Sequence, residues 1–280
     1  MSRFLASVCL MAAALVSHAA GVGLISDVRG RAVLDGNPQR PADLLTELGA
    51  GAQLRLDPEA RITVLYLATG DEYILKGPGR FQVNKDGPTA IEGNVPEQRR
   101  LSVQALQPPK ARTSSVAQAT LVMRSASPII SPRLLSPSAT KIATAAPVFR
   151  WEPVAGAVMY RFQLVDADGR TVAAAETGDT ETALPPSLRL QTGAPYSWSV
   201  EVRLPGDRKR VSRTEFAVLD AEEMVRLERA RPGSKATFSE RVAYALLLES
   251  LDLREEAIAS WRTLAAERPE ADLLRRLAER

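Results

Sequence analysis

The chain has 280 residues, 36 Lys and Arg against 33 Asp and Glu, and 45% hydrophobic residues, which is ordinary for folded protein. Its one cysteine and one histidine, Cys9 and His18, both lie in the first eighteen positions. Aromatic residues make up only 5% of the chain, which favours several modest cores over one large enzyme body.

Residues 1–19 are typical of a cleaved secretory signal. Arg3 supplies a positive start, residues 4–16 form an uncharged apolar run, and small residues follow it. This run is shorter than the roughly 20 residues that span a bilayer, although a retained membrane anchor is the alternative. We predict cleavage after Ala19, no stable membrane span afterwards, and a periplasmic protein of a Gram-negative bacterium.

Signal removal would leave neither cysteine nor histidine in the chain. This excludes disulfides, thiolate nucleophiles, Ser-His-Asp triads and zinc sites built from His or Cys. Carboxylate chemistry, a Ser/Lys arrangement or a cation held by oxygen ligands remains. We therefore expect a non-enzymatic protein with no catalytic, cofactor-binding or metal-binding residues.

Residues 20–105 are predicted to form an all-β module. Short alternating runs are separated by turn residues, a pattern typical of a sandwich or small barrel. The expected strands are 22–27, 31–34, 53–56, 61–67, 72–75, 80–83 and 101–103.

Turn and core residues in this module form four short patterns: Gly30-x-Ala-x-Leu34, Leu48-Gly49 before Ala52-x-Leu54, Ala60-x-Ile-x-Val64, and Gly70 leading to Tyr73-x-Leu75-x-Gly77-Pro78. Together they resemble the FecR-type domain, a periplasmic β-rich domain named for the regulator of iron-citrate uptake. The resemblance implies a periplasmic module for protein binding or sensing. Iron-citrate regulators place a cytosolic segment and a membrane helix before this domain, where this chain has the predicted signal. We expect the glycines to adopt positive φ at Gly30, Gly49, Gly51, Gly70 and Gly77.

Residues 106–146 are predicted to be a basic linker rich in Pro, Ser and Ala. Repeated prolines disfavour both helix and central strand. From residue 101 to 146 there is no acid and there are five cations: Lys110, Arg112, Arg124, Arg133 and Lys141. Attachment to anionic envelope polymers is the functional alternative. The apolar pieces 121–123 and 128–130 are candidate edge strands.

Residues 147–219 are predicted to form a second β module. Phe-x-Trp-x-Pro at 149–153, the alternating Tyr160-x-Phe-x-Leu164, and Tyr-x-Trp-x-Val at 196–200 are similar to fibronectin type III or immunoglobulin-like domains. We expect Trp151 and Trp198 to lie in the core, and an aromatic platform for carbohydrate is the alternative.

Three acidic clusters are candidate sites. Asp166-Ala-Asp168-Gly169 resembles the start of a calcium loop, but it lacks further ligands and favours a hairpin turn. Asp71-Glu72 and Glu255-Glu256 are adjacent pairs whose side chains diverge on a strand or a helix, so we expect solvated charges.

Residues 220–280 switch to helical periodicity. We expect helices at 220–230, from Thr237 or Ser239 to 251, at 253–267 and at 270–280. Ala245, Ala257, Trp261 and Pro269 have spacings that resemble one tetratricopeptide repeat. One repeat cannot bury its own face, so these helices must pack on the sandwich, on each other or on a partner.

The sequence thus predicts a mainly β fold with a small C-terminal α segment: a FecR-like domain, a fibronectin- or Ig-like sandwich and helical hairpins. The expected function is an envelope scaffold or sensory module that binds protein partners through residues 220–280. The alternative is attachment to peptidoglycan or another cell-wall glycan, and a carboxylate-dependent hydrolase is a third possibility. No nucleic-acid partner is expected.

Overall fold

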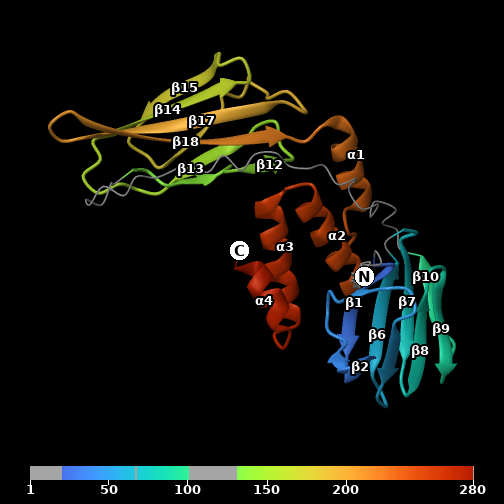
Figure 1. Ribbon diagram of the computed structural model, residues 1–280. Coiled ribbons are helices and arrows are strands. Elements are labelled where there is room, and N and C mark those ends of the chain that lie inside the picture. Colours follow the sequence, from blue (N-terminus) through green and yellow to red (C-terminus); the bar gives the residue numbers. More distant parts are fainter. Residues whose placement is uncertain (1–20, 67, 101–130, 280) are drawn as a thin grey trace, which may run out of the picture.

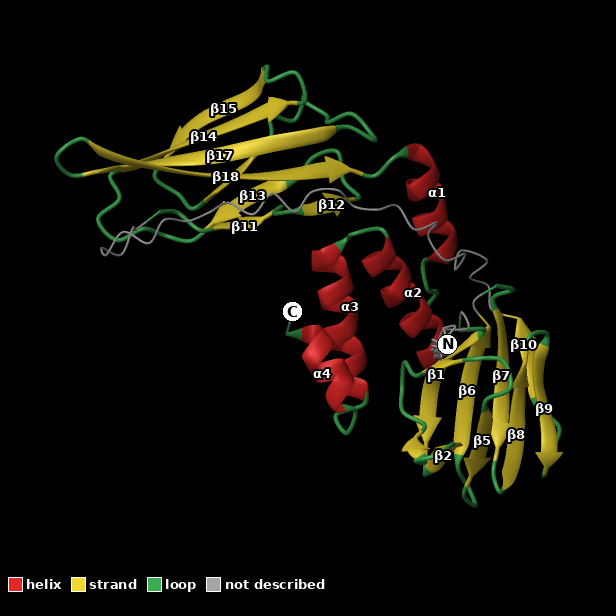
Figure 2. Cartoon of the chain, viewed as in Figure 1, coloured by secondary structure: helices red, strands yellow, loops and turns green. Residues whose placement is uncertain are grey.

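The computed structural model describes residues 21–66, 68–100 and 131–279. It contains two β sandwiches with a group of helices beside them (Figures 1 and 2). The predicted fold class, mainly β with a small C-terminal α segment, is confirmed. The predicted signal 1–19, the strand 101–103 and the apolar pieces 121–123 and 128–130 lie outside the described residues.

The first sandwich packs two five-stranded sheets, ordered β10-β7-β6-β1-β4 and β3-β2-β5-β8-β9. Its strands are β1 Gly23–Arg29, β2 Ala32–Asp35, β3 Arg40–Pro41, β4 Glu47–Leu48, β5 Gln53–Leu56, β6 Arg61–Tyr66, β7 Asp71–Lys76, β8 Gly79–Asn84, β9 Gly87–Glu92 and β10 Glu97–Arg100.

The core of the first sandwich follows from the apolar alternation in its sequence. Ile25, Leu54, Ile62, Val64 and Phe81 are fully buried between the two sheets. The predicted runs become β1, β2, β5, β6, β7 and β8. The sequence pattern did not indicate the other four strands, because they are either very short or carry edge residues such as proline and charges.

Positive φ is confirmed at Gly30, Gly51 and Gly70, and the prediction is wrong at Gly49 and Gly77. Glycine is needed at position 77 because a side chain has no room there, and not because the backbone has a positive φ. A Cβ there would lie 2.0 Å from the backbone oxygen of Asp57, so no larger residue fits without moving the chain.

The second sandwich has a three-stranded sheet, β11-β13-β16, and a five-stranded sheet, β12-β18-β17-β14-β15. Its strands are β11 Leu134–Ser136, β12 Thr140–Ile142, β13 Val148–Trp151, β14 Met159–Asp166, β15 Thr171–Thr177, β16 Glu181–Ala183, β17 Pro195–Leu204 and β18 Arg208–Val218. This is an immunoglobulin- or fibronectin-like sandwich. β11 and β12 fall inside the segment 106–146 that was predicted as linker, because a three-residue edge strand leaves little periodic signal.

Trp151 and Trp198 lie in the core of the second sandwich, as predicted. They are 2% and 0% exposed, and both rings pack edge-on or tilted against other core aromatics. The indole nitrogen of Trp198 donates to the oxygen of Pro137 at 2.7 Å, which fixes the edge strand region against the core. The alternative of a surface platform for carbohydrate is wrong for these two side chains.

Four helices follow the second sandwich: α1 Ala221–Ala230, α2 Phe238–Ser250, α3 Arg254–Glu267 and α4 Asp272–Ala278. Capping residues set the starts of the first two. Asp220 caps α1 and Thr237 caps α2, and each takes part in a capping box with the glutamate three residues later. All four helices match the predicted ones within two residues at each end. We refer to residues 221–278 as the helical segment.

Candidate functional site

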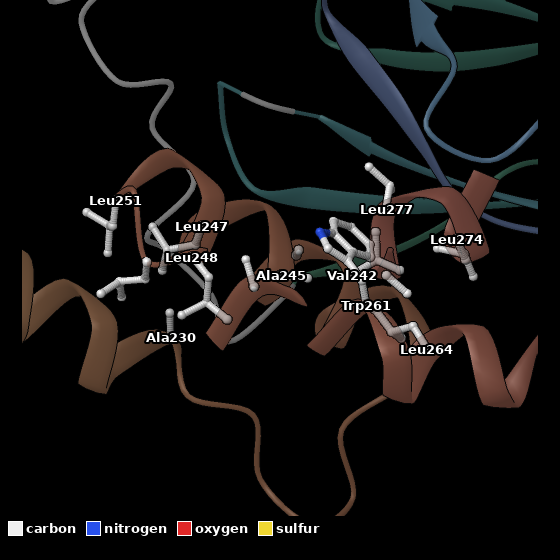
Figure 3. Packing of buried hydrophobic residues seen from close by; sticks show 14 of the residues in the cluster. Ala230, Val242, Ala245, Leu247, Leu248, Leu251, Trp261, Leu264, Leu274 and Leu277 are labelled. Atoms are coloured by element: carbon white, nitrogen blue, oxygen red, sulfur yellow. The ribbon is translucent and has the colours of Figure 1, made fainter. Parts of the chain in front are cut away.

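The helical segment has one hydrophobic core to which both sandwiches contribute. Trp261 is fully buried at its centre, beside Val242 of α2 and Leu277 of α4 (Figure 3). Leu44 and Leu65 of the first sandwich belong to the same cluster, as does Leu219 at the end of the second. The need of one helical pair for an apolar neighbour is thus met partly within the chain.

The second sandwich joins the helical segment through the turn between α2 and α3. The Thr140 hydroxyl donates to the oxygen of Asp252 at 2.6 Å and accepts from the backbone nitrogen of Arg254 at 3.2 Å. The backbone nitrogen of Lys141 also donates to Asp252. Thr140 and Lys141 are in edge strand β12. The turn between α2 and α3 therefore provides hydrogen-bond partners for the outer edge of that sheet.

The first sandwich joins the helical segment where β1 and β7 meet the start of α2. The register of β1 against β6 slips between Ile25 and Asp27, which leaves Ser26 at a bulge. Ser26 is fully buried, and Ser239 in the first turn of α2 donates a hydrogen bond to its hydroxyl oxygen. The bulge and the helix start therefore bring two hydroxyl groups together inside the joint.

A carboxyl group completes this buried cluster. Ser26 donates to the oxygen of Thr63 at 3.3 Å, Ser239 donates to Ser26, and the Glu72 carboxyl is hydrogen-bonded to Ser239. Each serine has one hydroxyl proton, so Ser239 cannot donate to Ser26 and to Glu72 at the same time. The hydrogen bond with Ser239 favours the ionised form of Glu72, in which the carboxylate accepts from the hydroxyl.

Burial, as the largest effect, raises the pKa of Glu72, and the carboxylates of Glu240 and Asp27 act in the same direction. The hydrogen bond with Ser239 and the positive charge of Arg99 lower that pKa in part. Glu72 is only 2% exposed. The expectation that Asp71 and Glu72 are solvated is therefore wrong, because α2 covers this end of β7.

A groove with a volume of 780 Å³ lies beside this joint, between β1 and the helical segment. On the sandwich side it is lined by β1 and the loop before β4, and on the other side by the start of α2, the α3–α4 connection and α4. The groove-lining residues that carry charge are Asp27, Arg29, Asp43, Arg268, Glu270, Asp272 and Arg276.

Charges in the groove divide into a paired floor and a free rim. Asp27 forms ion pairs with Arg268 at 3.6 Å and with Arg29 at 3.7 Å, and the Arg268 guanidinium lies 4.5 Å from the centre of the Phe238 ring. Asp43, Glu270 and Arg276 have no ion pair with any described residue. The rim thus presents both signs of charge around an apolar patch that includes Leu44 and Leu273.

The other acidic clusters do not converge on the groove. Asp166 accepts from the backbone nitrogens of Asp168 and Arg170 at 3.0 and 2.9 Å, which confirms the predicted hairpin turn. Glu255 and Glu256 line a smaller cavity of 280 Å³ beside β12. No group of three or more potential metal ligands occurs within residues 21–66, 68–100 and 131–279.

Two of the five predicted linker cations are paired. Arg133 contacts Glu152 at 3.1 Å, and the Lys141 ammonium contacts the carboxylate of Glu223 on α1. Lys110, Arg112 and Arg124 lie outside the described residues. Within the part of the chain that the structure describes, no helix has the length and apolar character needed to cross a membrane.

The fold and the groove define a multi-module β protein with a helical joint. No family model matches the chain, and no curated protein matches it. Among solved structures, the chain is similar to CopC from Methylosinus trichosporium OB3b, with 17% identity over 32% of this chain and 95% of that chain and a TM-score of 0.26. It is also similar to the fn3 domain of the human collagen alpha-1(XX) chain, with 18% identity over 35% of this chain and 87% of that chain and a TM-score of 0.27. These values carry no functional argument.

Proposed function

We propose that this chain is a non-enzymatic scaffold or sensory protein of the periplasm, with a FecR-type first sandwich and a tetratricopeptide-like helical pair. One observation carries the proposal: the helical segment is built into both sandwiches, so it fixes their relative orientation and leaves a groove at the first joint. A rigid arrangement of binding modules is what a scaffold requires.

The groove is the proposed docking site for an envelope protein. Three charged residues at its rim have no ion pair with a described residue: Arg276, Glu270 and Asp43. The rest of the groove consists of an apolar patch and the ion pair between Asp27 and Arg268. An apolar centre with a polar rim is typical of protein interfaces. The mixed charges of the rim would select the partner by electrostatic complementarity.

Two neighbouring arginines on α4 allow a matched test. Arg276 lines the groove, whereas Arg275 is also exposed but contacts only Asp272 of its own helix. A photo-crosslinking amino acid at 276 should capture an envelope protein in intact cells, and the same group at 275 should capture much less. Equal capture from both positions, or from neither, would contradict docking in the groove.

Deleting residues 220–280 would be a less informative test. Removal of the helices would expose Leu44, Leu65 and the buried Ser26, so loss of a partner would not distinguish a missing binding site from a damaged sandwich. The charge reversal Arg276→Glu, compared with Arg275→Glu, alters the proposed site while both joints stay intact. We expect at least a tenfold loss of partner recovery for the first, equivalent to about 1.4 kcal/mol.

Attachment to a cell-wall glycan is the second candidate. The buried tryptophans give it no support, and Arg133 and Lys141 are neutralised within the chain. Sedimentation with purified cell wall at low and high salt tests it. Salt-sensitive sedimentation that is lost on neutralising Lys110, Arg112 and Arg124 would favour this candidate over the protein scaffold.

Carboxylate-dependent hydrolysis has little geometric support. Glu72 and Glu240 are two buried acids close enough to raise the pKa of Glu72, but neither lines the groove. Glu240 also accepts from the Thr237 backbone nitrogen at 2.7 Å and lies 3.8 Å from Arg99, so it serves the start of α2. We therefore propose a structural role for this acid pair.

A further inference from the structure

Strand β18 of the second sandwich is covered along only part of its outer side. It lies between β17 and the short strand β12, and β12 pairs with residues 216–218 alone (Figure 1). No strand of the described chain pairs with the outer side of residues 208–213. These six residues have the sequence RKRVSR, and on their inner side they pair with β17 in an unbroken register. We refer to residues 208–213 as the basic edge.

The covered end of β18 shows which backbone groups of the basic edge point outward. The oxygen of Glu215 and the nitrogen of Leu219 both form backbone hydrogen bonds on the β12 side. Since backbone groups alternate between the two sides of a strand, the odd-numbered residues of β18 direct their N–H and C=O groups away from β17. On the basic edge these residues are Lys209, Val211 and Arg213.

The basic edge combines positive charge with one apolar side chain. Its four cations are accompanied by no acid, and they are Arg208, Lys209, Arg210 and Arg213. Lys209 lies 3.6 Å from Glu201 on β17, whereas the three arginines have no ion pair with any described residue. The Arg210 guanidinium donates to the Lys209 backbone oxygen at 2.8 Å. Val211 is 57% exposed, and it shares a face of the sheet with the residues two positions before and after it.

We propose that the basic edge binds an acidic, extended segment of another protein, which adds to the sheet as an antiparallel strand beside β18. Strand addition gives affinity through backbone hydrogen bonds and specificity through alternate side chains. Lysine and arginine at a sheet edge oppose pairing with a basic or identical strand, and the same charges attract an acidic one. A second copy of this edge is therefore the wrong occupant, because it would bring four more cations and no acid.

Two other anionic partners fit the basic edge less well. Residues 203–213 include no aromatic side chain on which a nucleic-acid base would stack. An anionic lipid surface would attract the cations, but it would leave the outward backbone groups of β18 without a ladder partner. The basic edge shares no residue with the groove, so this proposal does not depend on docking there.

Fluorescence anisotropy of a labelled peptide, ETVEEE, mixed with the purified full chain tests the proposal. In the antiparallel register its acids lie opposite the four cations and its valine lies opposite Val211. The interface is small, so we expect a Kd of roughly 10–100 µM. Binding should weaken as the salt concentration rises from about 50 to about 500 mM, because the opposed charges are exposed to solvent.

Two N-methylated forms of the peptide separate strand addition from simple charge attraction. Methylation of the valine nitrogen removes a donor that faces Val211, whereas methylation of the next glutamate removes a donor that faces away from β18. Both peptides keep the same charge. The first should bind at least about tenfold more weakly than the unmodified peptide, and the second should bind as the unmodified peptide does.

Val211→Pro and Val211→Thr are the matched variants of the protein. Proline removes the outward N–H group without removing a bond to β17, so it should abolish peptide binding, and threonine should retain it. Thermal unfolding of both variants verifies the fold, and the methylated peptides decide the question on the wild type if the proline variant does not fold. Equal binding of the two methylated peptides, no binding by the wild type up to about 1 mM, or full binding by a folded Val211→Pro would overturn the proposal. Binding to phosphatidylglycerol vesicles without discrimination between the peptides would also overturn it, in favour of a lipid surface.

Discussion

Replacing Glu72 with glutamine should strengthen the joint between the first sandwich and the helical segment at neutral pH. Glutamine has nearly the shape of glutamate and carries no charge into the buried cluster, so it avoids the desolvation of a carboxylate. Its amide oxygen accepts from Ser239 in place of the carboxylate, and this hydrogen bond is worth about 0.5–1.5 kcal/mol. It loses the attraction of Arg99, whose side chain is 48% exposed, so this loss is below about 1 kcal/mol.

The effect of Glu72→Gln depends on pH with a definite sign. Burial raises the pKa of Glu72 in the folded protein above its unfolded value of 4.5. Between these two pKa values the folded state binds more protons than the unfolded state, so the contribution of Glu72 to stability is complete below about pH 4.5 and is lost as the pH rises through the folded pKa. Glutamine does not titrate, so the variant lacks this loss.

Thermal unfolding at several pH values from about 4 to 8 measures this effect. We expect Glu72→Gln to match the wild type near pH 4 and to gain about 1 kcal/mol at pH 7, or roughly 4–8 °C in a module of this size. Glu47→Gln, at an exposed position of β4 in the same sandwich, is the control and should show no such trend. A stability difference between Glu72→Gln and wild type that is constant with pH, or a less stable variant at pH 7, would contradict a raised pKa of Glu72 in the folded protein.

Three further changes probe the fold. Trp198→Ala should lower the unfolding free energy of the second sandwich by about 3–5 kcal/mol in urea titrations, since it empties a core position and removes the bond to Pro137. Gly77→Ala should destabilise the first sandwich in calorimetry, because the new Cβ meets the Asp57 oxygen. Thr140→Val should cost about 1–3 kcal/mol and accelerate amide hydrogen exchange around Asp252 while the sandwich core stays protected.

The sequence predicted the parts of the fold that carry strong local signals. The helix starts at Asp220 and Thr237 follow from capping boxes, and the core positions of Trp151 and Trp198 follow from alternation along long strands. Strands of two or three residues, such as β11, have no usable period. Their positions depend on pairing with residues far away in the chain, as β11 pairs with β13.

The candidate site could not be predicted because it is made by contacts between modules. Ser26 and Ser239 are 213 positions apart, and nothing in either local sequence indicates their contact. From the sequence alone, Glu72 looks like an exposed charge on a strand, and only the packing of α2 makes it buried. The sequence indicates that the helical pair needs an apolar neighbour, but it does not indicate that Leu44 and Leu65 of the first sandwich belong to that neighbour.

The two joints of the helical segment differ in physical character. At Thr140 the joint has neutral hydrogen bonds to backbone groups, and the neighbouring Lys141 forms an ion pair with Glu223 of α1. At Glu72 the joint contains a carboxyl whose pKa is raised by burial and which is flanked by the charges of Arg99, Glu240 and Asp27. Ionisation of Glu72 as the pH rises is therefore expected to weaken the first joint, because it leaves a charge in a buried site.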